Sequence, residues 1–332
     1  MTAVESRAAA RMLMCRYCNE RAVDASRLVE ASERQFGLGG RYRYATCDAC
    51  GALALLDAPD DPSAFYPRDY YSLAPPAPSG GLVIAAKRAA KRAATRYALT
   101  GAGLCGRLVS ALQPSPAHGL GEWLLRAGVT RDSRILDVGC GAGALLDALA
   151  DVGYTRLCGV DPFLREERHA GAVRLYRRAL EAHDEPADFV MLHHVLEHVP
   201  DPRATLDAVR RLLAGGGGGG GHALVRVPIV PSEAWERYGA AWVQLDAPRH
   251  VTIPSERGLA LLAARSGLRV VASAHDSTPI QFWGSELYRR GLTLQDGART
   301  LSWLAKRRGA LRARRLNAER RGDQAAFLLA PA

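Results

Sequence analysis

The stretch over residues 134–161 constrains the fold of this 332-residue chain more than any other. Its sequence, RILDVGCGAGALLDALADVGYTRLCGVD, begins with a short apolar segment of strand length at 134–138. Three glycines at alternating positions come next: Gly139, Gly141 and Gly143. Apolar residues at helical spacing follow over 144–152, and a second apolar segment, 157–160, ends in Asp161. This order predicts a parallel βαβ unit of the kind that binds a nucleotide.

The glycine turn accounts for how such a unit would hold its ligand. Glycine has no Cβ, so the backbone can turn tightly and approach the ligand closely. The first turn of the following helix offers unpaired N–H groups, and Asp161 would accept the hydroxyls of a ribose. Read alone, the G-x-G-x-x-A run from Gly139 to Ala144 also fits a dinucleotide fingerprint.

Asp137, at the end of the first strand, favours a different ligand. Together with the turn it gives D-x-G-x-G-x-G, which resembles the first motif of class I S-adenosylmethionine (SAM) methyltransferases. The resemblance implies an α/β fold, a Rossmann-like seven-stranded sheet with helices on both faces. It also implies a set of SAM-binding residues: Asp137, Gly139, Cys140, Gly141, Gly143 and Asp161.

A second block strengthens this resemblance. Further strands are expected at 172–175, 188–192, 222–227 and 268–274, with a last one starting at 279–283. The fourth strand, 188–192, is followed by HHVLEHVPDP, a block that the ubiquinone-biosynthesis O-methyltransferases also carry. At the carboxyl edge of the sheet it would lie beside the cofactor. We therefore expect three further cofactor contacts: Leu180, His193 and His194.

The loop before residue 254 contains WVQLDAPRH, which resembles a narrower group of enzymes that modify sugars and surface polysaccharides. Methyl transfer to a hydroxyl or an activated carbon needs a general base near neutral pH, and we expect His250 to be that base. Asp246 or Glu197 would orient it. Glu197 and His198 could instead form the base pair, or hold a divalent ion as suggested for the quinone enzymes.

Four cysteines near the N-terminus form two C-x-x-C pairs: Cys15 with Cys18, and Cys47 with Cys50. Four thiolates are the ligand set of a tetrahedral structural zinc ion, and residues 41–46 predict a strand leading to the second pair. Four protein ligands leave no open coordination position, so the ion would stabilise the fold and do no chemistry. This pattern predicts a zinc ribbon in a reducing compartment.

The formal net charge of +10 is concentrated near the C-terminus, where eight basic residues and one acidic residue lie between 301 and 321. This basic segment could contact an anionic membrane surface or nucleic acid, although a solvated helical extension is the simpler interpretation. No signal peptide and no transmembrane segment are indicated, so we expect a cytoplasmic protein.

These patterns predict four regions: a zinc ribbon (1–58), an aromatic and proline-rich linker with helices (59–128), a SAM-dependent methyltransferase domain (129–295) and a basic tail (296–332). The function that they favour is methyl transfer to a small-molecule, glycan-linked or lipid-linked acceptor. Two alternatives remain open. One is an RNA methyltransferase that uses the ribbon and tail for recognition, and the other is a SAM-binding module without activity.

Overall fold

The computed structural model describes residues 14–20, 28–59, 61–65, 82–112, 119–214, 220–294 and 303–332. Three features of the sequence lie partly outside these residues: the aromatic cluster beyond Phe65, most of the glycine run at 215–221, and the start of the basic segment. Among the described residues, no helix combines the length and the apolarity needed to cross a bilayer.

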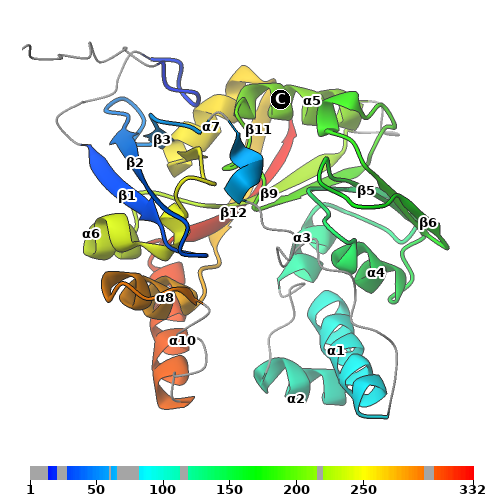
Figure 1. Ribbon diagram of the computed structural model, residues 1–332. Helices are drawn as coiled ribbons and strands as arrows, with labels where there is room; N and C mark the ends of the chain where they lie inside the picture. The colour runs from blue at the N-terminus through cyan, green and yellow to red at the C-terminus, as the bar shows by residue number, and fades with distance from the viewer. Residues whose placement is uncertain are drawn as a thin grey trace, which may run out of the picture.

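The main sheet has eight strands in the order β11-β12-β9-β8-β4-β5-β7-β6 (Figure 1). Their bounds are β4 (Arg134–Val138), β5 (Arg156–Val160), β6 (Arg168–Ala170), β7 (Val173–Tyr176), β8 (Phe189–His193), β9 (His222–Pro228), β11 (Leu268–His275) and β12 (Gln324–Pro331). The five inner strands β7, β5, β4, β8 and β9 are parallel. The strand order reverses between β4 and β8, which is where doubly wound sheets bind ligands at their carboxyl edge.

Helices cover both faces of this sheet, as expected. Successive side chains of β8 point to opposite faces of the sheet. Phe189 and Met191 therefore pack into one core, and Val190 and Leu192 pack into the other. The first side is packed by α1 (Leu82–Thr100), α3 (Leu120–Arg126) and α4 (Ala144–Ala150). The second is packed by α5 (Pro202–Ala214) and α7 (Glu256–Arg265). α2 (Leu104–Leu112) packs against α1.

The predicted Rossmann-like sheet is confirmed, and the structure adds one strand to the seven expected. The addition, β6, is three residues long and forms an antiparallel hairpin with β7 at the sheet edge. The expected last strand at 279–283 is wrong, because this segment begins helix α8 (Ile280–Arg289). Buried residues of α8 recur at helical spacing, at Gln281, Gly284, Ser285 and Tyr288, which a short apolar window cannot distinguish from a strand.

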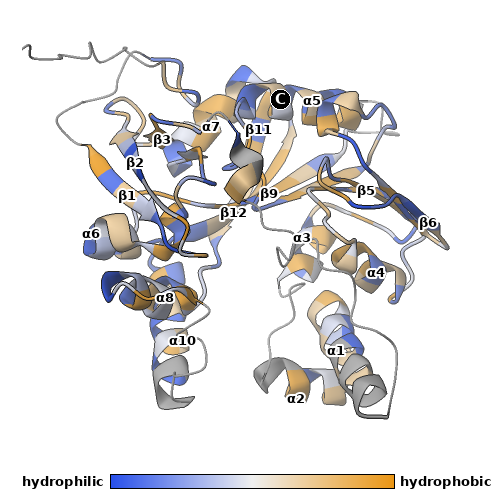
Figure 2. Ribbon diagram, in the orientation of Figure 1, coloured by the Kyte–Doolittle hydropathy of each residue, from blue (hydrophilic) through white to orange (hydrophobic). Residues whose placement is uncertain are grey.

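The true last strand is β12, and it lies inside the sheet between β9 and β11, antiparallel to both. Its apolar run AAFLLA is buried throughout. Residues 324–331 are therefore part of the main sheet, although the predicted boundary at 295 assigned them to a basic tail. Helix α10 (Trp303–Ala318), which carries many hydrophilic residues (Figure 2), leads into β12.

A second sheet of four antiparallel strands has the order β1-β2-β3-β10. Its strands are β1 (Val29–Glu33), β2 (Gly39–Thr46), β3 (Leu53–Leu55) and β10 (Thr252–Ile253). The predicted strand at 41–46 is confirmed within β2. Because β10 comes from the loop after β9, the N-terminal ribbon and the main domain share one sheet. Their common core includes Tyr44, Leu53, Trp242 and Leu245.

Short helices and 3-10 turns connect the longer elements. Helix α6 (Glu233–Tyr238) begins at its cap residue Ser232, whose hydroxyl accepts the Trp235 N–H. The 3-10 turns are η2 (Pro62–Phe65), η3 (Leu180–Ala182), η4 (Gly239–Ala241) and η5 (Val243–Leu245). Figure 1 shows α6 next to β1, on the side of the molecule away from β6.

Candidate active site

The glycine turn after β4 adopts the backbone conformation that its sequence predicts. Gly139, Gly141 and Gly143 all have positive φ, at 69°, 51° and 81°. A Cβ on Gly139 would lie 2.7 Å from the side chain of Val195, in the block that follows β8. The Asp161 carboxylate accepts the Gly141 N–H at 2.9 Å, which ties the turn to the end of β5. These residues form a cradle that side chains would fill, so they fit the cofactor expected there.

Asp137 lies on β4 under this turn and is 4% exposed. Burial, together with the nearby charge of Asp161, raises the pKa of Asp137 to about 7. Cys140, which follows the first glycine of the turn, packs against Gly159, where a Cβ would lie 2.6 Å from the Cys140 sulfur. Sequence reasoning missed Gly159, and a glycine inside a strand pattern is a signal of such close approach.

The other three expected cofactor contacts, Leu180, His193 and His194, lie in different surroundings. Leu180 begins η3 and is buried in the core. His193 ends β8, where burial lowers its pKa to about 3 and leaves its Nε2 atom without a hydrogen-bond partner. His194 has a φ of 55°, unusual for a residue with a side chain, and its Nδ1–H donates to Glu197 Oε1 at 3.1 Å.

His250 and Glu197, which are 53 positions apart in the sequence, meet beside this edge of the sheet. His250 Nδ1–H donates to the Gln244 carbonyl at 2.7 Å, so Nε2 carries the lone pair. That Nε2 lies 3.9 Å from Glu197 Oε1 and 3.9 Å from Asp246 Oδ2. Burial, followed by the neighbouring His198, lowers the pKa of His250 to about 4. His250 is therefore neutral and able to accept a proton at neutral pH.

His198 completes this cluster. Its Nδ1–H donates to the Arg249 carbonyl at 3.0 Å, and its ring packs edge-on against that of His250, with centroids 4.6 Å apart. Ligand atoms of Glu197, His198 and His250 all lie within 4.8 Å of one another. Glu197 Oε2 is buried and has no hydrogen-bond partner. This set can act in proton transfer, or it could hold a divalent ion, since metal-binding histidines usually donate their other N–H to a carbonyl or carboxylate.

Arg249 anchors the loop that carries His250. Its side chain is fully buried, and Nη2 lies 2.5 Å from Asp246 Oδ1 and 2.8 Å from Glu33 Oε1 in the ribbon. Burial alone would lower the pKa of Arg249, but these two carboxylates hold it above its ordinary value. Sequence reasoning assigned Asp246 to orient His250, whereas the structure pairs it mainly with Arg249. It missed Glu33, because a single acid on a short strand gives no signal.

The four cysteines predicted to hold zinc come together where the turn at 15–18 meets the turn that follows β2. All four sulfur atoms lie within 4.8 Å of one another, and the Cys15–Cys50 and Cys18–Cys47 sulfur pairs are each 3.6 Å apart. Tetrahedral zinc with a Zn–S bond of about 2.3 Å needs sulfur atoms roughly 3.8 Å apart, so the cluster fits the ion.

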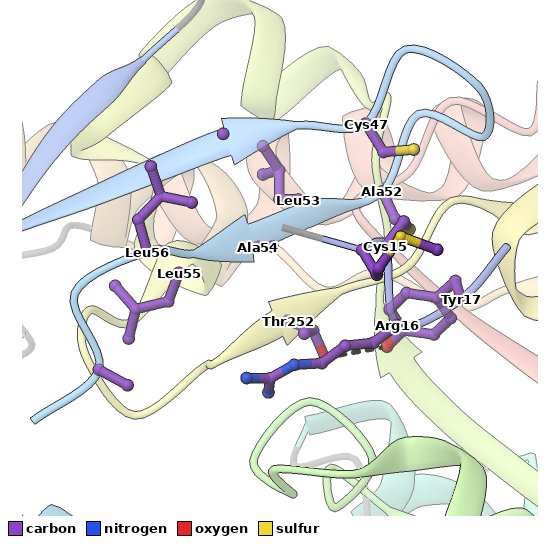
Figure 3. Close-up of a pocket in the computed structure, with 13 residues that line it drawn as sticks. Cys15, Arg16, Tyr17, Cys47, Ala52, Leu53, Ala54, Leu55, Leu56 and Thr252 are labelled. Carbon is purple, nitrogen blue, oxygen red and sulfur yellow. Dashed lines mark hydrogen bonds between the residues drawn. The ribbon is translucent and has the colours of Figure 1, made fainter. Parts of the chain in front are cut away.

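The first cysteine turn also reaches toward the His250 loop. Figure 3 shows Tyr17, between Cys15 and Cys18, with its hydroxyl on Thr252 of β10. The two oxygen atoms are 3.2 Å apart, and the Tyr17 ring is fully buried. A cavity of about 90 Å³ lies beside these residues, under β2 and β3. The cysteine cluster is thus packed directly against the segment that follows His250.

Several basic residues of the basic segment pair with acids of the same chain. Arg312 and Arg321 both contact Glu233 at the start of α6. Arg320 contacts Glu256 at the start of α7, where His275 also binds. These ion pairs connect α10 and the approach to β12 with the rest of the molecule. They reduce the charge that the segment can offer to an external anion.

Comparison with known proteins agrees with this geometry. The model of the family described as a methyltransferase domain matches residues 108–273, half of the chain. A ubiquinone biosynthesis O-methyltransferase from Cereibacter sphaeroides is 38% identical over 127 residues, 35% of this chain and 50% of the relative. One from Bordetella avium is 34% identical over 166 residues, 44% of this chain and 67% of the relative.

The chain spans about half the length of the first of these relatives. Among solved structures, the cyclopropane synthase MmaA2 from Mycobacterium tuberculosis is similar with a TM-score of 0.39 and 17% identity. That likeness covers 64% of this chain and 83% of the synthase. The family match covers the glycine turn, Asp161, Glu197, His198 and His250. The chain belongs to the methyltransferase domain family.

Proposed function

We propose that this protein is a SAM-dependent methyltransferase whose acceptor is a small molecule or a glycan-linked or lipid-linked group, with His250 as the general base. The observation that carries the proposal is the orientation of His250, whose Nε2 lone pair faces the buried Glu197 at the carboxyl edge of the sheet. The shared HHVLEHVPDP block and the family match support methyl transfer. The resemblance of WVQLDAPRH to sugar-modifying enzymes favours a sugar hydroxyl or carbon.

The residues of the turn would bind SAM, and the histidine cluster would prepare the acceptor. When bound, SAM supplies a methyl group whose carbon is electrophilic because it is attached to a positive sulfur. Asp137 and the turn, with Asp161 on the ribose, would hold the cofactor in line with the acceptor. His250 Nε2 would take the hydroxyl proton as the acceptor oxygen bonds to the methyl carbon.

The two nearby carboxylates raise the pKa of His250 and so offset part of the lowering that burial causes. The imidazolium formed in the reaction would lie 3.9 Å from both Glu197 and Asp246. Buried opposite charges at this separation stabilise the proton once it has moved. Glu197 and His194 would act as one unit through their 3.1 Å hydrogen bond. We assign zinc held by the four cysteines a structural role in this scheme.

The base assignment is tested by comparing His250→Gln with His169→Gln, because His169 is exposed on the edge strand β6. We expect kcat to fall by about 10²- to 10⁴-fold in His250→Gln only, since general acid–base catalysis contributes in that range. The Kd for SAM should stay within about twofold in both. Full activity of His250→Gln would contradict the assignment.

A divalent ion on Glu197, His198 and His250 is a second candidate role for the cluster, favoured by ligand atoms within 4.8 Å of one another. Under that alternative, activity depends on an added ion, and His198→Gln raises the ion concentration needed for half-maximal rate. Under the base mechanism, dialysis against a chelator that leaves the zinc content unchanged also leaves kcat unchanged. Titrating the divalent ion while measuring kcat thus distinguishes the metal role from the base role.

A further inference from the structure

The turn that carries His250 is held from outside by the N-terminal ribbon. Arg249 bridges Asp246 of the turn and Glu33 at the end of β1, and its Nη1 also donates to the Phe65 carbonyl at 3.2 Å. Its guanidinium lies over the ring of Phe36, 5.1 Å from the centroid. Both Arg249 and Glu33 have fully buried side chains. Buried ion pairs of this kind fix geometry, because neither partner can move into water without leaving the other unpaired.

We propose that Glu33, a ribbon residue far from the cofactor turn in sequence, is a positioning residue for methyl transfer. It holds Arg249, which in turn holds Asp246 in the conformation that presents His250 to Glu197. This inference rests on the function proposed above. Asp246 has a φ of 38°, a left-handed conformation that is uncommon for residues with a side chain, although aspartate adopts it more readily than most. The two hydrogen bonds from Arg249 to its carboxylate hold it in that conformation.

A second ribbon residue holds the backbone of His250 itself. The Tyr44 hydroxyl donates to the His250 carbonyl at 2.9 Å, and Tyr44 is fully buried on β2. The next residue, Val251, donates its N–H to the Glu197 carbonyl at 2.8 Å and accepts the Leu55 N–H at 2.9 Å. His250 therefore lies between two fixed points, one on the ribbon and one in the block after β8.

Glu33 can be altered without changing its size. Its carboxylate accepts the N–H groups of Gln35, Phe36 and Leu38 as well as the Arg249 guanidinium. Every neighbour is a donor, so a glutamine amide would place an N–H₂ group against another donor and weaken the hold on Arg249. Glu30, on the same strand, makes an exposed ion pair with Arg41, and Glu30→Gln is the matched control.

The test compares full-length Glu33→Gln with Glu30→Gln. We expect kcat to fall by about 10- to 100-fold in Glu33→Gln, because small displacements of a catalytic group cost this much. The KM for SAM and the zinc content should remain at wild-type values, and amide hydrogen exchange should accelerate over 246–251. Glu30→Gln should match wild type throughout. Unchanged kcat in Glu33→Gln, or a kcat loss matched by loss of SAM binding and zinc, would overturn the inference.

Tyr44→Phe provides a milder variant should Glu33→Gln fold poorly. It removes one hydroxyl, and we expect kcat to fall by about 3- to 10-fold with an unchanged KM for SAM. Wild-type kcat in this variant counts against the ribbon as a positioning element. If wild-type protein transfers no methyl group to any acceptor, the proposed function fails. The exchange measurement then decides alone: faster exchange over 246–251 in Glu33→Gln supports the positional role, and unchanged exchange overturns it.

Discussion

The Nδ1–H of His250 donates to the main-chain carbonyl of Gln244 at 2.7 Å. A carbonyl can only accept, so this bond fixes the tautomer and leaves Nε2 as the acceptor of a proton. The seven residues 244–250 thus close into a loop that orients the proposed base. A backbone carbonyl thus determines the tautomer of His250, and Glu197 Oε1 lies 3.9 Å from its Nε2 atom.

The pH dependence of kcat/KM should reflect the lowered pKa of His250. A base acts in its unprotonated form, and burial lowers the pKa of His250 to about 4, so activity is retained as the pH falls through 6.5 and is lost only below about 5. Steady-state rates between pH 4.5 and 8 test whether activity stays nearly constant through pH 6.5. An acid limb centred near 6.5 would show that His250 is more exposed to water during turnover than the structure indicates.

SAM binding should release a proton from Asp137. Burial raises its pKa to about 7 in the free protein, so much of it is protonated below that pH. A cationic ligand beside it favours the carboxylate and expels the proton, and affinity should rise about tenfold per pH unit from 5.5 to 6.5. Calorimetry in buffers of different ionisation enthalpy counts the proton. The variant Asp137→Asn should release none, and release from that variant would place the titrating group elsewhere.

Metal content should follow the cysteine cluster. We expect one zinc ion per chain in wild-type protein, lost in Cys47→Ser and retained in Cys105→Ser, since Cys105 is exposed on α2 and outside the cluster. Loss of the ion should also lower the melting temperature, because metal binding and folding are coupled. Elemental analysis with thermal unfolding checks both. Zinc retained by Cys47→Ser would exclude the four-cysteine site.

Stability should fall as the pH rises through the pKa of Asp323. This buried carboxyl accepts the indole N–H of Trp242 at 2.9 Å, and burial raises its pKa to about 6. The pKa of Asp323 is higher in the folded state than in the unfolded state. Its contribution to the free energy of unfolding is therefore fully present below about pH 4 and falls by on the order of 2 kcal/mol as the pH rises to 6. Urea unfolding at pH 4.5 and 7.5 measures the difference. Asp323→Asn should remove it; an unchanged pH dependence in that variant would assign it to another group.

The sequence was most informative where one residue type has one structural use. The glycines at 139, 141 and 143 predicted the turn because only positive φ explains their spacing, and the structure has positive φ at all three. The two C-x-x-C pairs likewise predicted a cluster that the fold assembles from separate turns. Local motifs of this kind carry their geometry within a few residues.

The long-range parts of the fold were harder to predict. The strand β12 follows a highly charged helix, so composition favoured a solvated tail, although its pairing with β9 and β11 places it inside the sheet. The partnership of Glu33 with Arg249 spans 216 positions and leaves no local pattern. The meeting of His250 with Glu197 could be anticipated only because both belong to recognisable motifs at the same edge of the sheet.

Transfer of a labelled methyl group from SAM tests whether this protein methylates a small-molecule or glycan-linked acceptor with His250 as the base. Wild-type protein and His250→Gln would be incubated with two pools, one of nucleotide-sugars with glycolipid extract and one of total RNA. We expect label in the first pool, lost in His250→Gln and kept in His169→Gln. Label that appears only in RNA and disappears on RNase treatment would contradict this expectation, as would SAM binding without transfer to either pool.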